Sequence, residues 1–311
     1  MRLFENKKAY GLTCVEIANL LNEVNGEDKG ESAYRKEYAA FNRGRMYEAC
    51  KGESQIATRI LSISDLHCPF HLPVETFIDY IDRVDVLQLN GDISDCQAIS
   101  RFPKVYRVSP MEELIITRKY IIDLINYLHP KKVVINYGNH DIRFQNYMSK
   151  NLDTDLLELM PKTSLELIFE DGFHHYNKRE RTKVWYAPLN ESFENVEIVY
   201  NDNWFSQIGE VIFCHPLTYS SQPMMTVEKA RRYFKDEGYD FSTIVMAHTH
   251  RVGSYPVGNT MMYEQGAACN VKEMKYHDGN FVRTQKEGFI YICLDKNGKE
   301  IESKTKLVRL N

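Results

Sequence analysis

The sequence has no long apolar run. Its hydrophobic stretches, such as residues 133–135 and 211–214, fall far short of the roughly 20 residues that span a bilayer. The first residues also lack the apolar core of a secretory signal peptide. These absences predict a cytoplasmic protein with no membrane-bound part.

Paired cysteines and an excess of positive charge are also missing. The seven cysteines form an odd set without CxxC spacing, which argues against a disulfide framework or a cysteine zinc site. A net charge of −4 argues against a generally basic surface, so any contact with nucleic acid must come from local patches. What remains is ordinary globular composition, with 43% hydrophobic and 26% charged residues in 311 positions.

Apolar periodicity from about residue 59 onward alternates between strand and helix patterns, which predicts an α/β fold with a parallel or mixed sheet flanked by helices. Turn residues separate further strands near the C-terminus. The expected strands are residues 59–64, 84–89, 132–136, 197–200, 211–214, 243–247, 253–257, 260–265 and 288–294, and the expected helices are residues 73–83, 111–128 and 226–237.

Residues 1–55 have a different character and are predicted to form a separate helical arm. Thr13 and Glu16 form a capping-box pattern at the start of one helix, and a second helix is expected over residues 32–50. Residues 32–51 carry five basic residues against two acidic ones, a local net charge of +3. The arm resembles a helix-turn-helix module, but its connection is long and acidic. DNA binding and a packing or homo-oligomerisation role therefore both stay open.

Metal-ligand side chains follow several of the predicted strands. Because the carboxyl ends of the strands in an open α/β sheet face one crevice, these side chains should converge. A single His or Asp at a strand end is more often a cap or turn residue, but an ordered set seldom arises by accident. The set is Asp65, His67, Asp92, Asn139, His140, His215, His248 and His250.

The donors in this set are carboxylate and amide oxygens together with imidazole nitrogens, and no thiolate is among them. Such a mixture suits manganese, iron or zinc better than calcium or magnesium alone. Two divalent cations about 3.5–4 Å apart need one carboxylate that bridges them. Asp92 is the predicted bridge, and two Mn²⁺ ions are the expected cofactor, with iron or zinc as alternatives.

The spacing of these residues resembles the calcineurin-like metallophosphoesterase family. Its motifs D-x-H, G-D-x-x-D, G-N-H-[DE], a lone H and G-H-x-H recur in order between Asp65 and His250. The resemblance implies a four-layer α/β/β/α sandwich over residues 56–311, preceded by the small helical segment. Ala247 replaces the usual Gly of the last motif without removing a ligand. In Ser/Thr protein phosphatases, an Arg-Gly pair follows the last Asp of the G-D-x-x-D motif. Here that Asp is Asp95, and no Arg-Gly follows it.

The resemblance also implies a role for each residue. Asp65, His67, Asp92 and His250 would hold one metal, and Asp92, Asn139, His215 and His248 the other. His140 would protonate the leaving oxygen or stabilise transition-state charge, with Asp95 orienting its imidazole. Arg143 and Arg251, next to two motifs, are candidates for substrate contact, weighed against an ordinary solvated or structural role.

Residues 142–195 form an insertion between the third and fourth motifs. It contains a basic, aromatic stretch over residues 178–186. Such a stretch can hold a phosphate backbone or stack a base, and a solvated loop that borders a β-strand is an interpretation of at least equal weight.

The leading functional hypothesis is a phosphodiesterase acting on nucleic acid or a nucleotide, loosely similar to phosphoesterases and nucleases of bacteria and phages. A metal-bound hydroxide would attack phosphorus while His140 assists the leaving group. The runner-up is a phosphomonoesterase or Ser/Thr-type protein phosphatase. A hypothesis of another class is a DNA-binding or scaffold protein with a vestigial site, which the complete ligand set disfavours.

Overall fold

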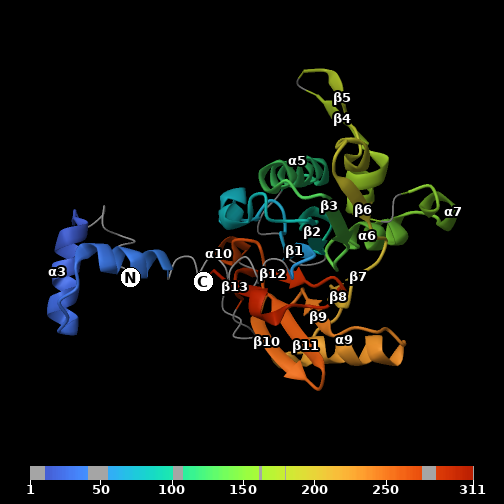
Figure 1. Cartoon of the computed structure of the whole chain (residues 1–311). Coiled ribbons are helices and arrows are strands. Elements are labelled where there is room, and N and C mark those ends of the chain that lie inside the picture. The colour runs from blue at the N-terminus through green and yellow to red at the C-terminus, as the bar shows by residue number, and fades with distance from the viewer. Residues whose placement is uncertain are drawn as a thin grey trace. The chain divides into compact units, whose positions relative to one another are not determined.

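The computed structural model describes residues 11–40, 55–100, 108–160, 163–178, 180–274 and 285–310. The chain divides into two compact units, Met1–Ile56 and Ala57–Asn311, and each is described by itself (Figure 1). Among the described residues, no helix is long and apolar enough to cross a membrane.

The N-terminal unit contains helix α3 (Cys14–Asn25) and a helical segment over residues 31–40. The capping box is present, because Glu16 N donates to Thr13 Oγ1 (3.2 Å) and Thr13 N donates to Glu16 Oε2 (2.7 Å). Asn22 organises the connection: its side chain bonds both backbone groups of Lys29 at 3.0 Å and accepts from the Tyr34 hydroxyl at 2.7 Å. The predicted second helix beyond residue 40 lies outside the described residues.

The larger unit is built on two sheets. The first has the order β13-β12-β1-β2-β3-β6, in which β1, β2, β3 and β6 run parallel and β12 and β13 pair antiparallel. The second has the order β10-β11-β9-β8-β7. The strands of the first sheet are β1 (Thr58–Ile63), β2 (Val86–Asn90), β3 (Lys132–Asn136), β6 (Glu197–Tyr200), β12 (Gly288–Leu294) and β13 (Lys306–Arg309); those of the second are β7 (Phe205–Ile208), β8 (Val211–Cys214), β9 (Thr243–Met246), β10 (Val252–Val257) and β11 (Thr260–Gln265).

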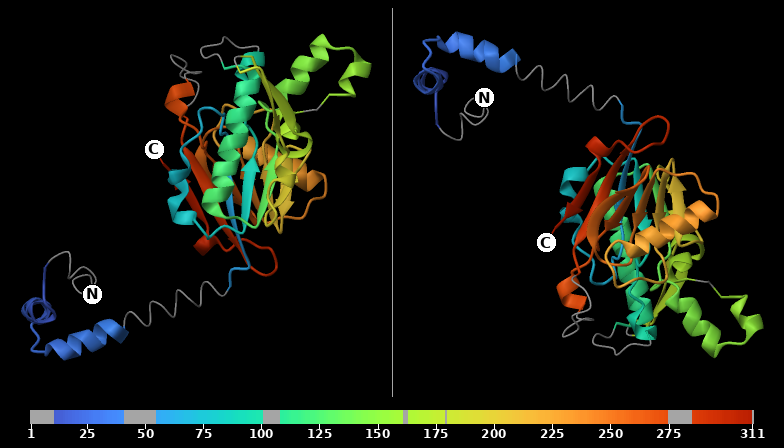
Figure 2. Two further views of the ribbon diagram at one scale, coloured as in Figure 1. Left: turned by 90° about the horizontal axis from the view of Figure 1, so that it is seen from above. Right: turned by 90° about the horizontal axis from the view of Figure 1, so that it is seen from below.

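The two sheets pack face to face through alternating side chains. In β8, Val211 and Phe213 join the core between the sheets, whereas Ile212 and Cys214 point to the opposite face, where they pack with Phe234 of helix α9 (Met225–Asp236). Helix α5 (Pro110–Leu128) covers the outer face of the first sheet (Figure 2). The resulting order of layers is α/β/β/α, which confirms the predicted fold class.

The helix predicted over residues 73–83 is not an α-helix in the structure. Residues 73–83 contain the 3₁₀ helix η1 (Val74–Tyr80), interrupted by non-helical angles at Phe77. Phe77 and Tyr80 both pack against Phe289, at ring-centroid distances of 5.1 and 5.5 Å. Since side chains at i and i+3 eclipse in a 3₁₀ helix, this geometry directs both rings to the same partner.

The insertion contains short helices followed by a β-hairpin. Residues 182–186, the last part of the basic, aromatic stretch, form the second strand of this hairpin. The elements are α6 (Arg143–Asn151), α7 (Thr154–Leu157), α8 (Ser164–Glu166), the π-helical turn η3 (Leu167–Asp171), β4 (Phe173–Asn177), β5 (Thr182–Tyr186) and η4 (Leu189–Glu191); elsewhere lie η2 (Gln97–Ile99), α10 (Val271–Met274) and η5 (Glu302–Lys304).

Candidate metal centre

The candidate ligands lie in the loops after five strands. Asp65 and His67 follow β1, Asp92 follows β2, and Asn139 with His140 follows β3. In the second sheet, His215 follows β8, and His248 and His250 follow β9, which is parallel to β8. The parallel strands of each sheet therefore bring these side chains to one edge of the sandwich.

Several of these residues have left-handed backbone angles, which non-glycine residues seldom adopt. Hydrogen bonds between neighbouring loops hold this conformation: Asp65 N donates to Gly91 O and His67 N donates to Asp92 O, both at 3.0 Å. Such strain concentrates at functional sites because the surrounding structure must enforce it. The φ values are 51° at Asp65, 44° at His67, 51° at Asp92, 80° at His248 and 51° at His250.

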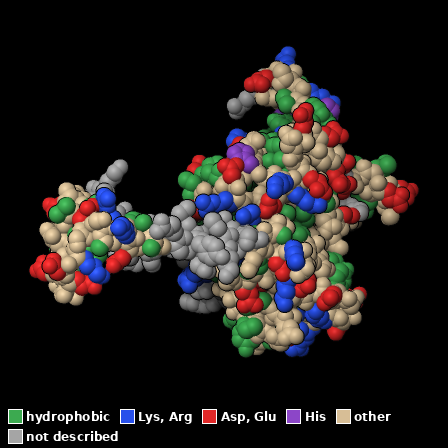
Figure 3. Space-filling model, in the orientation of Figure 1, with side chains coloured by type: hydrophobic (Ala, Val, Ile, Leu, Met, Phe, Trp, Pro, Cys, Tyr) green, Lys and Arg blue, Asp and Glu red, His purple; other side chains and the backbone are tan. Residues whose placement is uncertain are grey.

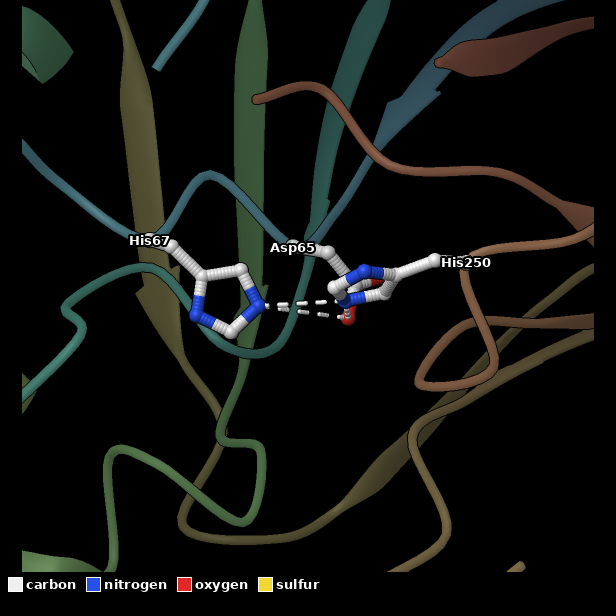
Figure 4. A group of neighbouring side chains, drawn as sticks. All are labelled: Asp65, His67 and His250. Atoms are coloured by element: carbon white, nitrogen blue, oxygen red, sulfur yellow. Dashed lines mark hydrogen bonds and ion pairs between the residues drawn. The ribbon is translucent and has the colours of Figure 1, made fainter. Parts of the chain in front are cut away.

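The first cluster consists of Asp65, His67 and His250, whose side chains point toward one another (Figure 4). His250 Nε2 lies 3.1 Å from Asp65 Oδ1 and 3.1 Å from His67 Nε2. All three residues are buried. Two ring nitrogens and one carboxylate oxygen thus face a common point.

The second cluster consists of Asp92, His215 and His248. His215 Nε2 lies 3.3 Å from Asp92 Oδ2 and 3.3 Å from Asn139 Oδ1, which adds the amide oxygen to this group. Asp92 Oδ2 also lies 3.8 Å from His67 Nε2 of the first cluster. Asp92 therefore stands between the clusters, where a bridging carboxylate is needed.

The residues present fit a pair of divalent cations. His248 Nε2 is buried and has no hydrogen-bond partner among the described residues, a costly arrangement unless it binds a ligand. His215 is oriented as metal-bound histidines are, since its Nδ1 donates to the Asn90 carbonyl at 2.9 Å and leaves Nε2 facing Asp92. The donor set contains only oxygen and nitrogen atoms.

The charges of the site are strongly coupled. Burial would raise the pKa of Asp92, but the imidazoles of His215 and His140 hold it well below its usual range. Burial would lower the pKa of His215, but Asp92 and Asp65 raise it to about 9. Burial, reinforced by His215, lowers the pKa of His248 to about 3. A neutral imidazole and ionised carboxylates are the forms that bind metal, so His248 is ready to bind at neutral pH, whereas a cation at His215 must displace its proton.

His140 belongs to a second hydrogen-bonded group beside the clusters. Its Nδ1 lies 3.0 Å from Asp95 Oδ1, and the same oxygen lies 3.1 Å from His67 Nδ1. Arg143 donates through Nη2 to His140 Nε2 and through Nη1 to the Asp95 carbonyl, both at 2.8 Å. Because arginine can only donate, His140 Nε2 is the acceptor here and its proton lies on Nδ1, toward Asp95.

The two arginines suggested for substrate contact differ in their surroundings. Arg143 is half-buried and bonded to His140 and Asp95, so it reaches the site. Arg251 donates through Nη2 to the Ser221 carbonyl at 2.7 Å. Their contact with substrate stays a prediction.

Two buried carboxylates support the site and were given no role from the sequence. Asp141 accepts from Gly138 N (2.8 Å) and Ser94 N (3.1 Å), so it ties the loop after β3 to the loop after β2. Its position inside the third motif was the available signal. Glu113 of α5 accepts from Cys96 N, and nothing in the sequence distinguished it from an ordinary helix glutamate.

Glu113→Gln should make the stability of the larger unit less dependent on pH. Burial raises the pKa of Glu113 to about 8, so its favourable contribution is complete below the unfolded value near 4.5 and is lost as the pH rises through 8. At about 1.4 kcal/mol per pKa unit, the loss amounts to a few kcal/mol. Denaturant unfolding at pH 5 and pH 9 should show the variant gaining stability over the wild type only at the higher pH.

Glu112→Gln is the matched control, because it removes a charge from an exposed position in the same turn of α5. It should leave the pH dependence of unfolding as in the wild type. An equal loss of stability with pH in the wild type and in Glu113→Gln would show that Glu113 does not titrate in this range.

Comparisons with known proteins separate the two units. Residues 1–53 match the YonJ N-terminal domain family. Over 48 residues the chain is 46% identical to the SPbeta prophage-derived uncharacterized protein YonJ of Bacillus subtilis strain 168, a match that covers 15% of this chain and 12% of that protein. The chain thus spans about an eighth of the length of the curated relative it matches.

Solved structures similar to the larger unit have low sequence identity. Vacuolar protein sorting 29 of Cryptosporidium parvum is 15% identical, with 82% of this chain and 99% of that chain covered and a TM-score of 0.37. A structure described as a novel archaeal phosphodiesterase is 11% identical, with 81% and 100% covered and a TM-score of 0.36. A predicted phosphoesterase of Streptococcus pneumoniae TIGR4 is 11% identical, with 81% and 98% covered and a TM-score of 0.30.

The family comparison of the larger unit is decisive. Residues 58–252, well over half of the chain, match the family described as calcineurin-like phosphoesterase, whose members hydrolyse phosphoesters with two metal ions. The matched segment contains all the clustered donors described above. The chain therefore belongs to the calcineurin-like phosphoesterase family.

Proposed function

We propose that this protein hydrolyses phosphodiesters of nucleic acid or nucleotides with the help of two divalent cations. The observation that carries the proposal is the position of Asp92, which stands within 4 Å of His67 on one side and of His215 on the other. A carboxylate shared by two ligand clusters is what a dinuclear centre requires.

One cation would be held by the first cluster and the other by the second, with Asp92 contributing to both. Asn139 supplies the additional oxygen ligand of the second site. Two divalent cations in these places supply Lewis acidity toward a phosphoryl oxygen and activate water for in-line attack. Mn²⁺ is the proposed ion, because mixed imidazole and carboxylate donors suit it.

His140 is the proposed acid for the leaving oxygen. Its Nδ1 is fixed by Asp95, whose carboxylate stabilises positive charge on the imidazole. Its Nε2 accepts from Arg143, so a substrate phosphate that attracts the guanidinium would free Nε2 to take up a proton from solvent and pass it to the leaving oxygen. Arg143 would then stay beside the phosphate as a charge-assisted donor.

Two features favour a nucleic acid or nucleotide diester over a phosphoprotein. The Arg-Gly typical of Ser/Thr protein phosphatases is missing after Asp95. The insertion also presents basic and aromatic side chains, which suit a polyanion that carries bases.

The purified chain with Mn²⁺ should hydrolyse bis-p-nitrophenyl phosphate faster than p-nitrophenyl phosphate, and a chelator should abolish both activities. The steady-state kcat/KM for the two chromogenic substrates gives the ratio. A preference for the monoester would replace the proposal with a phosphomonoesterase. Absence of any hydrolysis across Mn²⁺, Fe²⁺ and Zn²⁺ would support a vestigial site.

A further inference from the structure

The β4–β5 hairpin stands away from the rest of the larger unit (Figure 1). In its register, His174 is opposite Trp185 and Tyr176 is opposite Lys183. Since directly opposed side chains in an antiparallel pair lie on the same face, these four residues share one face of the hairpin. All four are exposed, with 55% of Tyr176 and 49% of Trp185 accessible to solvent. We call this surface the aromatic face.

The ring of Trp185 is held in place although half of it is exposed. Its centroid lies 4.6 Å from that of His174. Its edge packs against Gly172, where an added Cβ would lie 2.6 Å from Trp185 Cη2, so this close approach requires the glycine. The indole is therefore a fixed platform rather than a freely rotating side chain.

The root of the hairpin is anchored to the body. Phe173 is buried and stacks on Tyr186 at a centroid distance of 4.9 Å. Arg118 of α5 donates through Nη2 to the Ala187 carbonyl at 2.8 Å, just after β5. Because an isolated two-stranded hairpin is only marginally stable, this anchoring explains how it can present exposed rings in a defined position.

Positive charge surrounds the aromatic face. Residues 173–186 contain four Lys and Arg residues against one Glu, a local net charge of +3 in a chain of net charge −4. Within the part of the chain that the structure describes, Lys178, Arg181 and Lys183 form no ion pair. Basic side chains lie at the tip and on the side of this projection in the space-filling view, with acidic side chains beside them (Figure 3). The surface is thus complementary to a polyanion.

We propose that the aromatic face binds single-stranded nucleic acid. Bases would stack on Trp185 and Tyr176, while Lys178, Arg181 and Lys183 would contact phosphates. A duplex conceals the base faces, so unpaired bases are the partner that exposed rings recognise. A protein partner fits less well, because lysine is depleted in the core of protein interfaces and Lys183 lies on this face. The inference rests on the proposed function, whose substrate class it specifies.

Binding can be measured without hydrolysis by adding a chelator to the full-length chain and titrating a fluorescently labelled 20-mer of thymidylate. Trp185→Ala should weaken the affinity of the protein for this 20-mer by about tenfold or more. Trp185→Phe should retain part of the binding, because an aromatic ring remains. Lys183→Gln should weaken binding and reduce its salt dependence. Duplex of the same length should bind the wild type more weakly.

The matched control is Tyr255→Ala, which removes a tyrosine that is 58% exposed on β10, in a different sheet. It should bind the labelled strand as the wild type does. An unchanged affinity in Trp185→Ala, or equal affinity of the wild type for duplex and single strand, would overturn the inference.

The same preparation separates this inference from the proposed function. If the wild type with Mn²⁺ hydrolyses bis-p-nitrophenyl phosphate but does not bind the single strand, the aromatic face is not a nucleic-acid surface and the phosphodiesterase proposal stands. If it binds the strand through Trp185 but hydrolyses no diester, the binding inference holds and the catalytic proposal fails.

Discussion

Asp92→Asn should lower the turnover of bis-p-nitrophenyl phosphate by about a hundredfold or more. The substitution keeps the shape of the side chain and an oxygen that can accept from His140 N, a bond of 2.7 Å in the wild type. It removes the negative charge that stands between the clusters of His67 and His215. A neutral amide bridges two cations poorly, so the metal content should also fall below two ions per chain.

The control is Asp236→Asn, an exposed aspartate at the end of α9, which should keep wild-type turnover and metal content. Steady-state kinetics and elemental analysis of the same samples measure both quantities. Full turnover with two bound ions in Asp92→Asn would contradict a bridging role for Asp92.

His140→Ala should lower kcat for a dinucleotide by about a hundredfold or more. It should not reduce the metal content, because His140 is outside the proposed ligand set. The loss should depend on the leaving group. A poor alkoxide leaving group needs a proton, whereas p-nitrophenolate leaves readily without one. The variant should therefore lose more activity toward a dinucleotide than toward bis-p-nitrophenyl phosphate.

Kinetics on these two substrates, with metal content measured alongside, separates acid catalysis from other roles. An equal loss on both substrates would indicate that His140 stabilises charge on the phosphoryl group instead of protonating the leaving oxygen. Unchanged kcat on both would remove His140 from the catalytic machinery, and loss of a metal ion would identify it as a ligand.

The convergence of the candidate ligands could be predicted because it depends on the order and direction of the strands and not on particular side-chain contacts. β3, β8 and β11 are apolar runs bounded by polar residues, and their observed bounds agree with the expected ones. Once β1, β2 and β3 are parallel, their carboxyl ends must share an edge, and Asp65, Asp92 and His140 then lie near one another.

The parts that could not be predicted depend on tertiary contacts. In β5, Thr182 and the three residues after it are exposed, so the strand shows no alternation of buried and exposed positions, and its pairing with β4 is set by the anchored root. In η1, Phe77 and Tyr80 share Phe289 as a partner, which lies more than 200 positions away and is not visible in the local sequence pattern. Glu113 reaches Cys96 only because α5 packs beside the site.

The most direct test of the two-metal centre is the anomalous diffraction of crystals grown with Mn²⁺. Two peaks should appear about 3.5–4 Å apart, with the Asp92 carboxylate between them, His67 and His250 beside one, and His215 and His248 beside the other. Absence of both peaks at saturating Mn²⁺, or a single ion that does not contact Asp92, would contradict the account.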